Sequence, residues 1–199
     1  WVNSIIIAPS ERYTVDVLFE KEGSYNIESM SPEKAYKMGK IKVTNKNSKD
    51  NYLKIFNELH NDKEMNSEIA KVKSLFDKPV DKKLLLTVKM EMEHAEENPP
   101  KIEWEDTMPE MNSMMTSKEV VWEILDLETK KTNMDVHWNF KKGSYYKISI
   151  FNEPKSKHPM QHPVHFHGQR FLVLSQSGVK NTNLVWKDTF LVKTGETVE

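Results

Sequence analysis

The chain begins with alternating apolar and polar positions. Between residues 3 and 29, apolar side chains recur at every second position, as in Tyr13, Val15 and Val17. Because successive side chains of a strand point to opposite faces, a period of two predicts β-strands. We therefore expect residues 1–46 to form the last strands of a β domain.

The hydrophobic period then changes. After a polar break at residues 44–51, apolar residues recur three or four positions apart up to residue 76. This spacing predicts two short amphipathic helices. Asn66 or Ser67 is the expected N-cap of the second helix, because short polar side chains accept hydrogen bonds from the free N–H groups of a first turn. We expect residues 47–79 to form a helical linker.

From residue 80 the chain returns to short apolar runs of strand length. Gly, Asn and Pro residues separate these runs, which is typical of turns between strands. Residues 80–199 are therefore expected to form an all-β sandwich or barrel. The expected strands cover residues 84–93, 102–104, 119–127, 145–151, 169–176 and 183–192.

Composition narrows the classes of function. Lys and Arg number 29 and Asp and Glu 30, so the formal net charge is -1. This balance gives no general attraction to nucleic acid or to an anionic membrane. No apolar run approaches the roughly 20 residues that cross a bilayer as a helix. The chain has no cysteine, which excludes disulfides and thiolate ligands among its residues. It starts at Trp1, and both ends fall beside strands, so we expect a piece of a longer protein.

Imidazoles are concentrated in residues 158–171, which read HPMQHPVHFHGQRF. His162, His165 and His167 lie within six positions, and His158 stands just upstream. On a strand, His165 and His167 point to the same side with Cα atoms about 6.7 Å apart, so both rings can reach one metal or two neighbouring metals. His162 lies an odd number of positions earlier and is expected to face the other way.

Spacing alone leaves the metal open. Imidazole binds zinc, copper, iron and nickel, and satisfied structural histidines are an alternative that needs no metal. Three histidines at this parity favour a metal site. A cupin normally adds a glutamate a few residues later, but the sequence continues GQRFLVL. A metal-hydrolase barrel needs alternating helices, which the pattern lacks. Gly168, just after the pair, is expected to let another group approach the backbone closely.

The string HPVHFHGQRFLVL resembles the copper motif HPxHxHG in the last domain of the three-domain, laccase-like multicopper oxidases. NLVWKDTFLVKTGE and IEWEDTMPEMN resemble other segments of that domain, and IIIAPSERYTVDVLFEKEGSYNI resembles the end of the second domain. The resemblance implies a cupredoxin-like Greek-key β-sandwich or barrel over residues 80–199. It also implies the C-terminal strands of another cupredoxin-like domain over residues 1–46.

The resemblance also implies roles for individual residues. His162 matches the ligand of the type 1 copper, which takes electrons from phenols, aryl amines or low-valent metal ions. His165 matches a ligand of the type 2 copper, and His167 a ligand of one type 3 copper, in the cluster that reduces dioxygen to water. The implied partners are a small-molecule or metal-ion reductant, dioxygen and the other domains of the same protein, in an extracellular or periplasmic location. Asp188 is a candidate hydrogen-bond acceptor for a ligand histidine, or a strand-end cap.

The sequence departs from the family pattern in one important respect. The family's His-Cys-His stretch, whose thiolate completes the type 1 centre, has no counterpart here, and neither have the paired histidines of the first domain. We therefore expect this chain alone to be inactive. Two other hypotheses stay open: a non-catalytic β module that binds copper or zinc, and a copper-less member of the same family that serves in protein interaction.

Overall fold

The computed structural model describes residues 2–32, 34–46, 52–54, 56, 62–90, 120–156 and 159–199. His158 and the strand expected at residues 102–104 lie outside these described residues. Strands make up most of the regular secondary structure in the described part, beside one α-helix and three short 3-10 helices. The expectation of an all-β fold is confirmed.

Three sheets organise the described residues. The strands are β1 (Gly23–Met30), β2 (Ala35–Val43), β3 (Lys82–Met90), β4 (Val120–Asp126), β5 (Ile148–Asn152), β6 (His162–His165), β7 (Ser175–Gln176), β8 (Val179–Lys180), β9 (Thr189–Val192) and β10 (Thr197–Val198). The helices are η1 (Tyr52–Lys54), α1 (Lys63–Val72), η2 (Lys73–Leu75) and η4 (Asn133–Asp135). β1 pairs with β2, β6 pairs with β9, and the main sheet has the order β4-β3-β5-β10-β7-β8.

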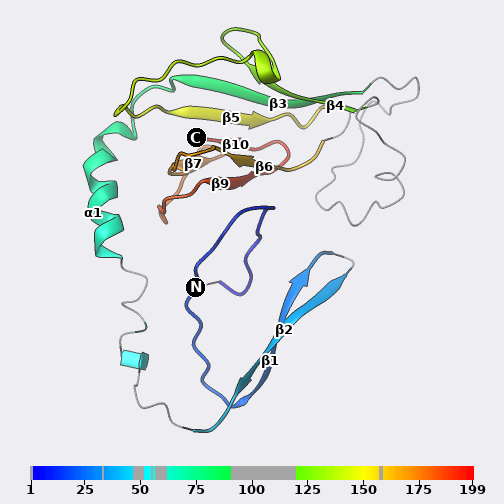
Figure 1. Ribbon diagram of the computed structural model, residues 1–199, viewed down its shortest axis with the longest axis vertical. Coiled ribbons are helices and arrows are strands. Elements are labelled where there is room, and N and C mark those ends of the chain that lie inside the picture. Colours follow the sequence, from blue (N-terminus) through cyan, green and yellow to red (C-terminus); the bar gives the residue numbers. More distant parts are fainter. Residues whose placement is uncertain are drawn as a thin grey trace.

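The main sheet is built around β3. This strand pairs antiparallel with β4 on one side and parallel with β5 on the other. β10 then pairs antiparallel with β5, which returns the end of the chain to the sheet. Figure 1 shows β3, β4 and β5 as one layer, with the β6–β9 pair lying below it in that view. The β domain therefore has two layers, the main sheet and the β6–β9 pair, and the second layer carries the histidines.

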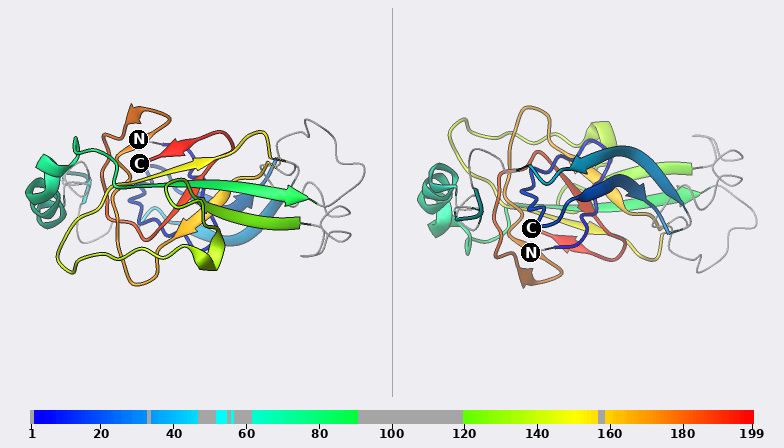
Figure 2. Two further views of the ribbon diagram at one scale, coloured as in Figure 1. Left: turned by 90° about the horizontal axis from the view of Figure 1, so that it is seen from above. Right: turned by 90° about the horizontal axis from the view of Figure 1, so that it is seen from below.

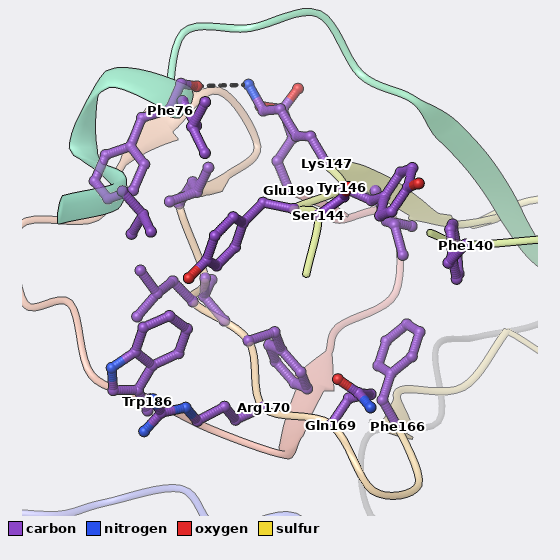
Figure 3. Close-up of a pocket in the computed structure, with 18 of the residues that line it drawn as sticks. Phe76, Phe140, Ser144, Tyr146, Lys147, Phe166, Gln169, Arg170, Trp186 and Glu199 are labelled. Atoms are coloured by element: carbon purple, nitrogen blue, oxygen red, sulfur yellow. Dashed lines mark hydrogen bonds and ion pairs between the residues drawn. The ribbon is translucent and has the colours of Figure 1, made fainter. Parts of the chain in front are cut away.

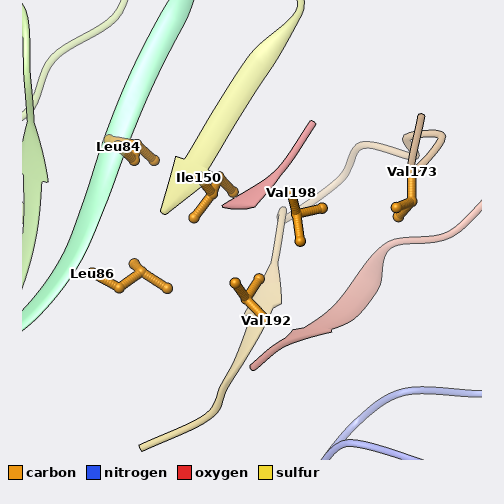
Figure 4. Close-up of a cluster of buried hydrophobic side chains, with 6 residues drawn as sticks. All are labelled: Leu84, Leu86, Ile150, Val173, Val192 and Val198. Atoms are coloured by element: carbon orange, nitrogen blue, oxygen red, sulfur yellow. The ribbon is translucent and has the colours of Figure 1, made fainter. Parts of the chain in front are cut away.

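A core of six buried aliphatic side chains fills the space between these layers. Leu84 and Leu86 stand two positions apart on β3 and are buried, whereas Leu85 between them is less buried. This alternation follows from the period of two along a strand. Figure 4 shows the side chains of Leu84, Leu86, Ile150, Val173, Val192 and Val198 converging from separate segments. Burial of each such side chain contributes about 1.5–3 kcal/mol.

The helix α1 begins earlier than the sequence pattern predicts. Its N-cap is Asp62, whose carboxylate accepts the backbone N–H of Met65 at 2.9 Å. The expected caps, Asn66 and Ser67, lie inside the helix instead. Ile69 is on its buried face, and Figure 2 shows the helix at one end of the main sheet. No helix in the described ranges is long and apolar enough to cross a membrane.

The N-terminal segment corrects a second expectation. The alternation at residues 12–19 predicts a strand, but residues 2–22 contain none. A strand needs a neighbour for its backbone hydrogen bonds, and no strand described here pairs with residues 12–19. Val15 and Val17 are accordingly exposed. The first regular structure is the β1–β2 hairpin, which Figure 1 shows far from β3 and β4.

Candidate metal centre

The strand β6 carries the first two histidines of the motif. It pairs antiparallel with β9, so that His162 lies opposite Val192 and His165 lies opposite Thr189. Directly opposite residues share a face of a strand pair. His162 therefore shares the face of Val192, which belongs to the core, while His165 shares the other face with Thr189.

The rings of His165 and His167 lie together on the exposed side of β6. Their centroids are 4.8 Å apart and the ring planes are inclined by 73°. Both residues are exposed, whereas Phe166 between them packs against the core. β6 ends at His165, and His167 lies in the turn that follows. The expected same-side placement of the two rings is confirmed.

His162 faces the other way and is half-buried. The edge of one ring meets the face of the other where His162 contacts Trp122 of β4, with centroids 5.1 Å apart and an interplanar angle of 79°. The structure therefore separates the three imidazoles into one on the inner face and two on the outer face. It brings His165 and His167 together and leaves His162 apart from them.

The hydrogen bonds of His165 determine which of its nitrogens carries the proton. Nδ1 lies 2.8 Å from the backbone oxygen of Asp188 and 2.9 Å from Oγ1 of Thr189. A carbonyl oxygen can only accept, so Nδ1 of a neutral ring must carry the hydrogen. Nε2 then keeps its lone pair, which is the form of imidazole that binds a metal. Local geometry thus prepares this ring as a ligand.

Asp188 supports the same ring through two groups. Its backbone carbonyl is the direct acceptor, and its carboxylate accepts a hydrogen bond from the Thr189 hydroxyl at 3.0 Å. The Arg12 guanidinium donates to the other carboxylate oxygen. The bond from Arg12, more than that from Thr189, holds the pKa of Asp188 below its ordinary value, although burial acts in the opposite direction. The expectation that Asp188 accepts a hydrogen bond from one of these histidines is confirmed for its backbone carbonyl, whereas its carboxylate reaches His165 only through Thr189.

A glycine in the left-handed region and a buried side-chain amide hold the backbone of the segment that carries the histidines. Gly168 has φ of 69°, in the left-handed region that favours glycine. Within the described part of the chain, a Cβ at this position meets no atom within 4 Å, so conformation explains the glycine, and none of these residues makes the expected close approach to the backbone. Buried Asn152 donates through Nδ2 to the backbone oxygens of Met160 at 2.7 Å and Val192 at 3.1 Å. These two acceptors lie beside and opposite His162.

A cavity of about 670 Å³ lies on the inner side of the histidine segment. Phe166 lines it, but His165 and His167 do not. Figure 3 shows aromatic rings around the cavity, with the Arg170 guanidinium beside Trp186. Arg170 lies 4.5 Å from the centre of the Trp186 ring. The cavity and the exposed imidazole pair are therefore separate features on opposite faces of one strand.

The donor set of the pair fits part of a copper site. Two neighbouring imidazoles, one with its Nδ1–H already donated, match the nitrogen ligands that copper and zinc accept. Across the described ranges, no group of three or more His, Cys, Asp or Glu side chains is arranged to hold one metal ion. The pair is thus an incomplete ligand set.

Sequence reasoning missed Arg12, Thr189 and Asn152. Arg12 lies 176 positions from Asp188, and nothing in the local pattern indicates that the two meet. Thr189 could have been found, because it lies opposite His165 once β6 and β9 are paired. Asn152 ends a strand and has no sequence signal that separates a buried amide from an exposed one.

Comparison with known proteins assigns the family. A family profile described as "Multicopper oxidase" matches residues 91–199, which is more than half of the chain. Searches of curated proteins and of solved structures gave no match. The profile and the predominance of β-sheet confirm the expected cupredoxin-like all-β fold and indicate a copper-dependent oxidoreductase. The chain belongs to the multicopper oxidase family.

Proposed function

We propose that His162, His165 and His167 are copper ligands of a laccase-like oxidase. In this proposal His162 binds the type 1 copper, His165 the type 2 copper and His167 one of the type 3 coppers. The observation that carries the proposal is the adjacent, exposed pair of imidazoles, with centroids 4.8 Å apart. The bond from Nδ1 of His165 to a carbonyl oxygen leaves its Nε2 free for a metal.

The proposed reaction joins the oxidation of a reductant to the reduction of dioxygen. Four single electrons from phenols, aryl amines or low-valent metal ions, together with four protons, convert one dioxygen molecule to two water molecules. Copper supplies the single-electron chemistry when it is bound. The residues of this chain hold the ligands: β6 separates His162 from the pair, and Thr189 and Asp188 orient His165.

The proposal includes a division of labour along the chain. Residues 80–199 form one cupredoxin-like domain, residues 47–79 a helical linker, and residues 1–46 the end of another domain. Because the chain contains no cysteine, it has no thiolate for a type 1 centre, and on its own it should bind copper without turnover. The other domains of the protein, in an extracellular or periplasmic location, are proposed to supply the remaining ligands.

A second candidate is a copper- or zinc-binding β module without oxidase activity. The absence of cysteine and the exposed imidazole pair favour it specifically. The two candidates differ in the metal that the pair prefers and in whether dioxygen is consumed once the other domains are present. A copper-less member of the family would bind neither metal at these rings.

Copper titration of the purified chain tests the proposal. We expect His165→Ala and His167→Ala each to weaken the tightest copper(II) site by about tenfold or more, with loss of nitrogen hyperfine coupling in its spectrum. His137→Ala is the matched control, because His137 is also exposed but lies on another segment, and it should leave that site unchanged.

Two results would count against the proposal. Equal copper affinity in the wild type and in the His165→Ala/His167→Ala double variant would remove the pair from the site. Tighter binding of zinc than of copper, with no dioxygen consumption by the protein that contains the other domains, would favour the module. Dioxygen consumption with ferrous iron or a phenol would favour the oxidase.

A further inference from the structure

Two neighbouring residues of the N-terminal segment meet two neighbouring residues that precede β9. Glu11 pairs with Lys187, and Arg12 pairs with Asp188. The two ion pairs have opposite polarity, so a shift of the segment by one residue would bring like charges together. The contact therefore specifies one register between positions 176 residues apart in sequence.

A tight turn holds the adjacent charged residues Glu11 and Arg12 in position. The Glu11 amide donates to the backbone oxygen of Ala8 at 3.0 Å, and Ser10 has φ of 65°. Pro9 followed by a left-handed residue is the arrangement of a type II turn. Nη1 of Arg12 donates to the backbone oxygen of Ser10 at 2.9 Å. The turn thus aims the guanidinium at Asp188.

From Arg12, hydrogen bonds continue to the imidazole of His165. Arg12 donates to one carboxylate oxygen of Asp188, and the Thr189 hydroxyl donates to the other at 3.0 Å. Because its hydrogen points to Asp188, the Thr189 oxygen presents a lone pair to Nδ1–H of His165, at 2.9 Å. The Nδ1–H group of His165 therefore donates a bifurcated hydrogen bond to this oxygen and to the Asp188 carbonyl.

We propose that Arg12 is a positioning residue for His165. The Asp188 carbonyl selects the Nδ1–H form of the ring, and the Arg12–Asp188–Thr189 chain sets the direction in which the ring plane is held. The inference rests on the proposed function of His165 as a copper ligand. It adds a contribution from the N-terminal segment to a site on β6.

The exposure of the ion pair separates positioning from stability. The Arg12 and Asp188 side chains are 68% and 31% exposed, and an exposed ion pair contributes little to folding stability. Removal of Arg12 should therefore change the geometry of His165 while the melting temperature stays near that of the wild type. If Arg12 served only the stability of the fold, its removal would lower the melting temperature and leave the geometry of His165 unchanged.

The experiment uses the full chain in four variants, Arg12→Ala, Arg12→Lys, Thr189→Val and Lys180→Ala. Nitrogen-15 NMR of the metal-free chain reports the fraction of the Nδ1–H form of His165 and the rate at which that hydrogen exchanges with water. Copper(II) titration reports affinity. Lys180→Ala is the matched control, because it removes a different exposed ion pair, that of Lys180 with Asp77, which has no part in the hydrogen bonds of His165.

We expect the largest effect from Thr189→Val, with faster Nδ1–H exchange and copper binding weaker by about tenfold. Arg12→Ala acts through one more hydrogen bond and should weaken copper binding by about threefold. Arg12→Lys should recover part of the loss, because it keeps the charge but not the forked geometry of the guanidinium. Lys180→Ala should match the wild type.

Wild-type exchange and wild-type copper affinity in Arg12→Ala would overturn the positioning role. So would equal losses in Arg12→Ala and Lys180→Ala. The NMR arm needs no metal, so it decides the positioning role even where copper fails to bind the wild-type chain, an outcome that would instead overturn the proposed function.

Discussion

Asp126, at the end of β4, is a carboxylate with no exposed surface. Burial by itself raises the pKa of this carboxyl. Hydrogen bonds from Trp138 Nε1 at 3.0 Å, the Glu128 amide at 2.9 Å and the Thr129 hydroxyl at 2.9 Å act in the opposite direction. Together they outweigh burial and lower the pKa to about 2. The charged form is therefore the one that stabilises the fold.

The low pKa of Asp126 predicts a stability that depends on pH. A pKa lowered in the folded state contributes stability that is present above the unfolded value, near 4, and is lost as the pH falls toward 2. Asp126→Asn replaces one accepting oxygen by an amide donor, which then faces a donor of Trp138, Thr129 or Glu128, and should cost about 2–3 kcal/mol at pH 7. Urea unfolding of both proteins between pH 7 and pH 2 measures the difference.

The difference between wild type and Asp126→Asn should shrink steadily below pH 4. Asp135→Asn is a suitable control, because the Asp135 side chain is exposed, and the free energy of unfolding of this variant should stay close to that of the wild type. A difference for Asp126→Asn that is constant from pH 7 to pH 2 would contradict the ionised, hydrogen-bonded assignment.

At the residue scale, the sequence predicted the direction in which side chains point better than it predicted their hydrogen-bond partners. The parity of His162, His165 and His167 on a strand correctly predicted that two rings share one side and the third faces the other way. Asp188 was a candidate acceptor from the sequence, but the use of its backbone carbonyl and the contribution of Thr189 depend on how β6 pairs with β9. Asp126 is one of 30 acidic residues, and only the folded structure shows that its carboxylate is buried among donors.

At the scale of elements, β6 is a short strand with one strand neighbour. Within the described residues it pairs only with β9, and it depends on Asn152 for further support. The Asn152 amide donates to the backbone oxygen of Met160, two residues before His162, and to that of Val192, opposite His162 on β9. Because Asn152 ends β5, this side chain connects the main sheet to the layer that carries the histidines.

We predict that Asn152→Ala loosens β6 more than it loosens the main sheet. It removes two buried hydrogen bonds to backbone oxygens and should cost about 2 kcal/mol in free energy of unfolding. Hydrogen exchange should quicken at the amides of β6 and β9 and change little in β3. Asn26→Ala, which removes an exposed bond to Glu28, is the control and should cost under about 0.5 kcal/mol. Equal acceleration in β3 and β6 would show that Asn152 has no local role.

Elements with long apolar runs were the predictable ones. β4 lies within the run expected at residues 119–127, and β3 and β5 overlap the runs expected at residues 84–93 and 145–151 with their edges shifted by a few residues. The run at residues 12–19 has the same period but no strand to pair with in the described part. The start of α1 was misplaced because several residues in that stretch can cap a helix, and Asp62 takes the role. Periodicity reports a preferred face, and pairing decides whether a strand forms.

At the scale of the whole molecule, one buried ion pair joins the N-terminal segment to the β domain. The Glu11 and Lys187 side chains are 2% and 10% exposed. The Lys187 ammonium also lies 3.8 Å from the centre of the Tyr13 ring, where a cation is favourable. The pair is thus desolvated on both sides, unlike the exposed pair between Arg12 and Asp188.

Removal of one partner from a buried pair leaves an uncompensated charge, which typically costs about 3–5 kcal/mol, whereas replacement of both by apolar residues is often close to neutral. We therefore expect Glu11→Gln and Lys187→Met each to release the N-terminal segment. The Glu11→Leu/Lys187→Met double variant should keep much of the docking. Hydrogen exchange at the Glu11 amide, which donates to Ala8 within the turn, and protease cleavage of residues 8–13 report the docking directly.

Because release of a segment need not unfold the β domain, these local measurements are more decisive than a melting temperature. If the double variant showed the sum of the two single losses, the pair would act independently of charge, and docking would have to be attributed to the turn and to Tyr13.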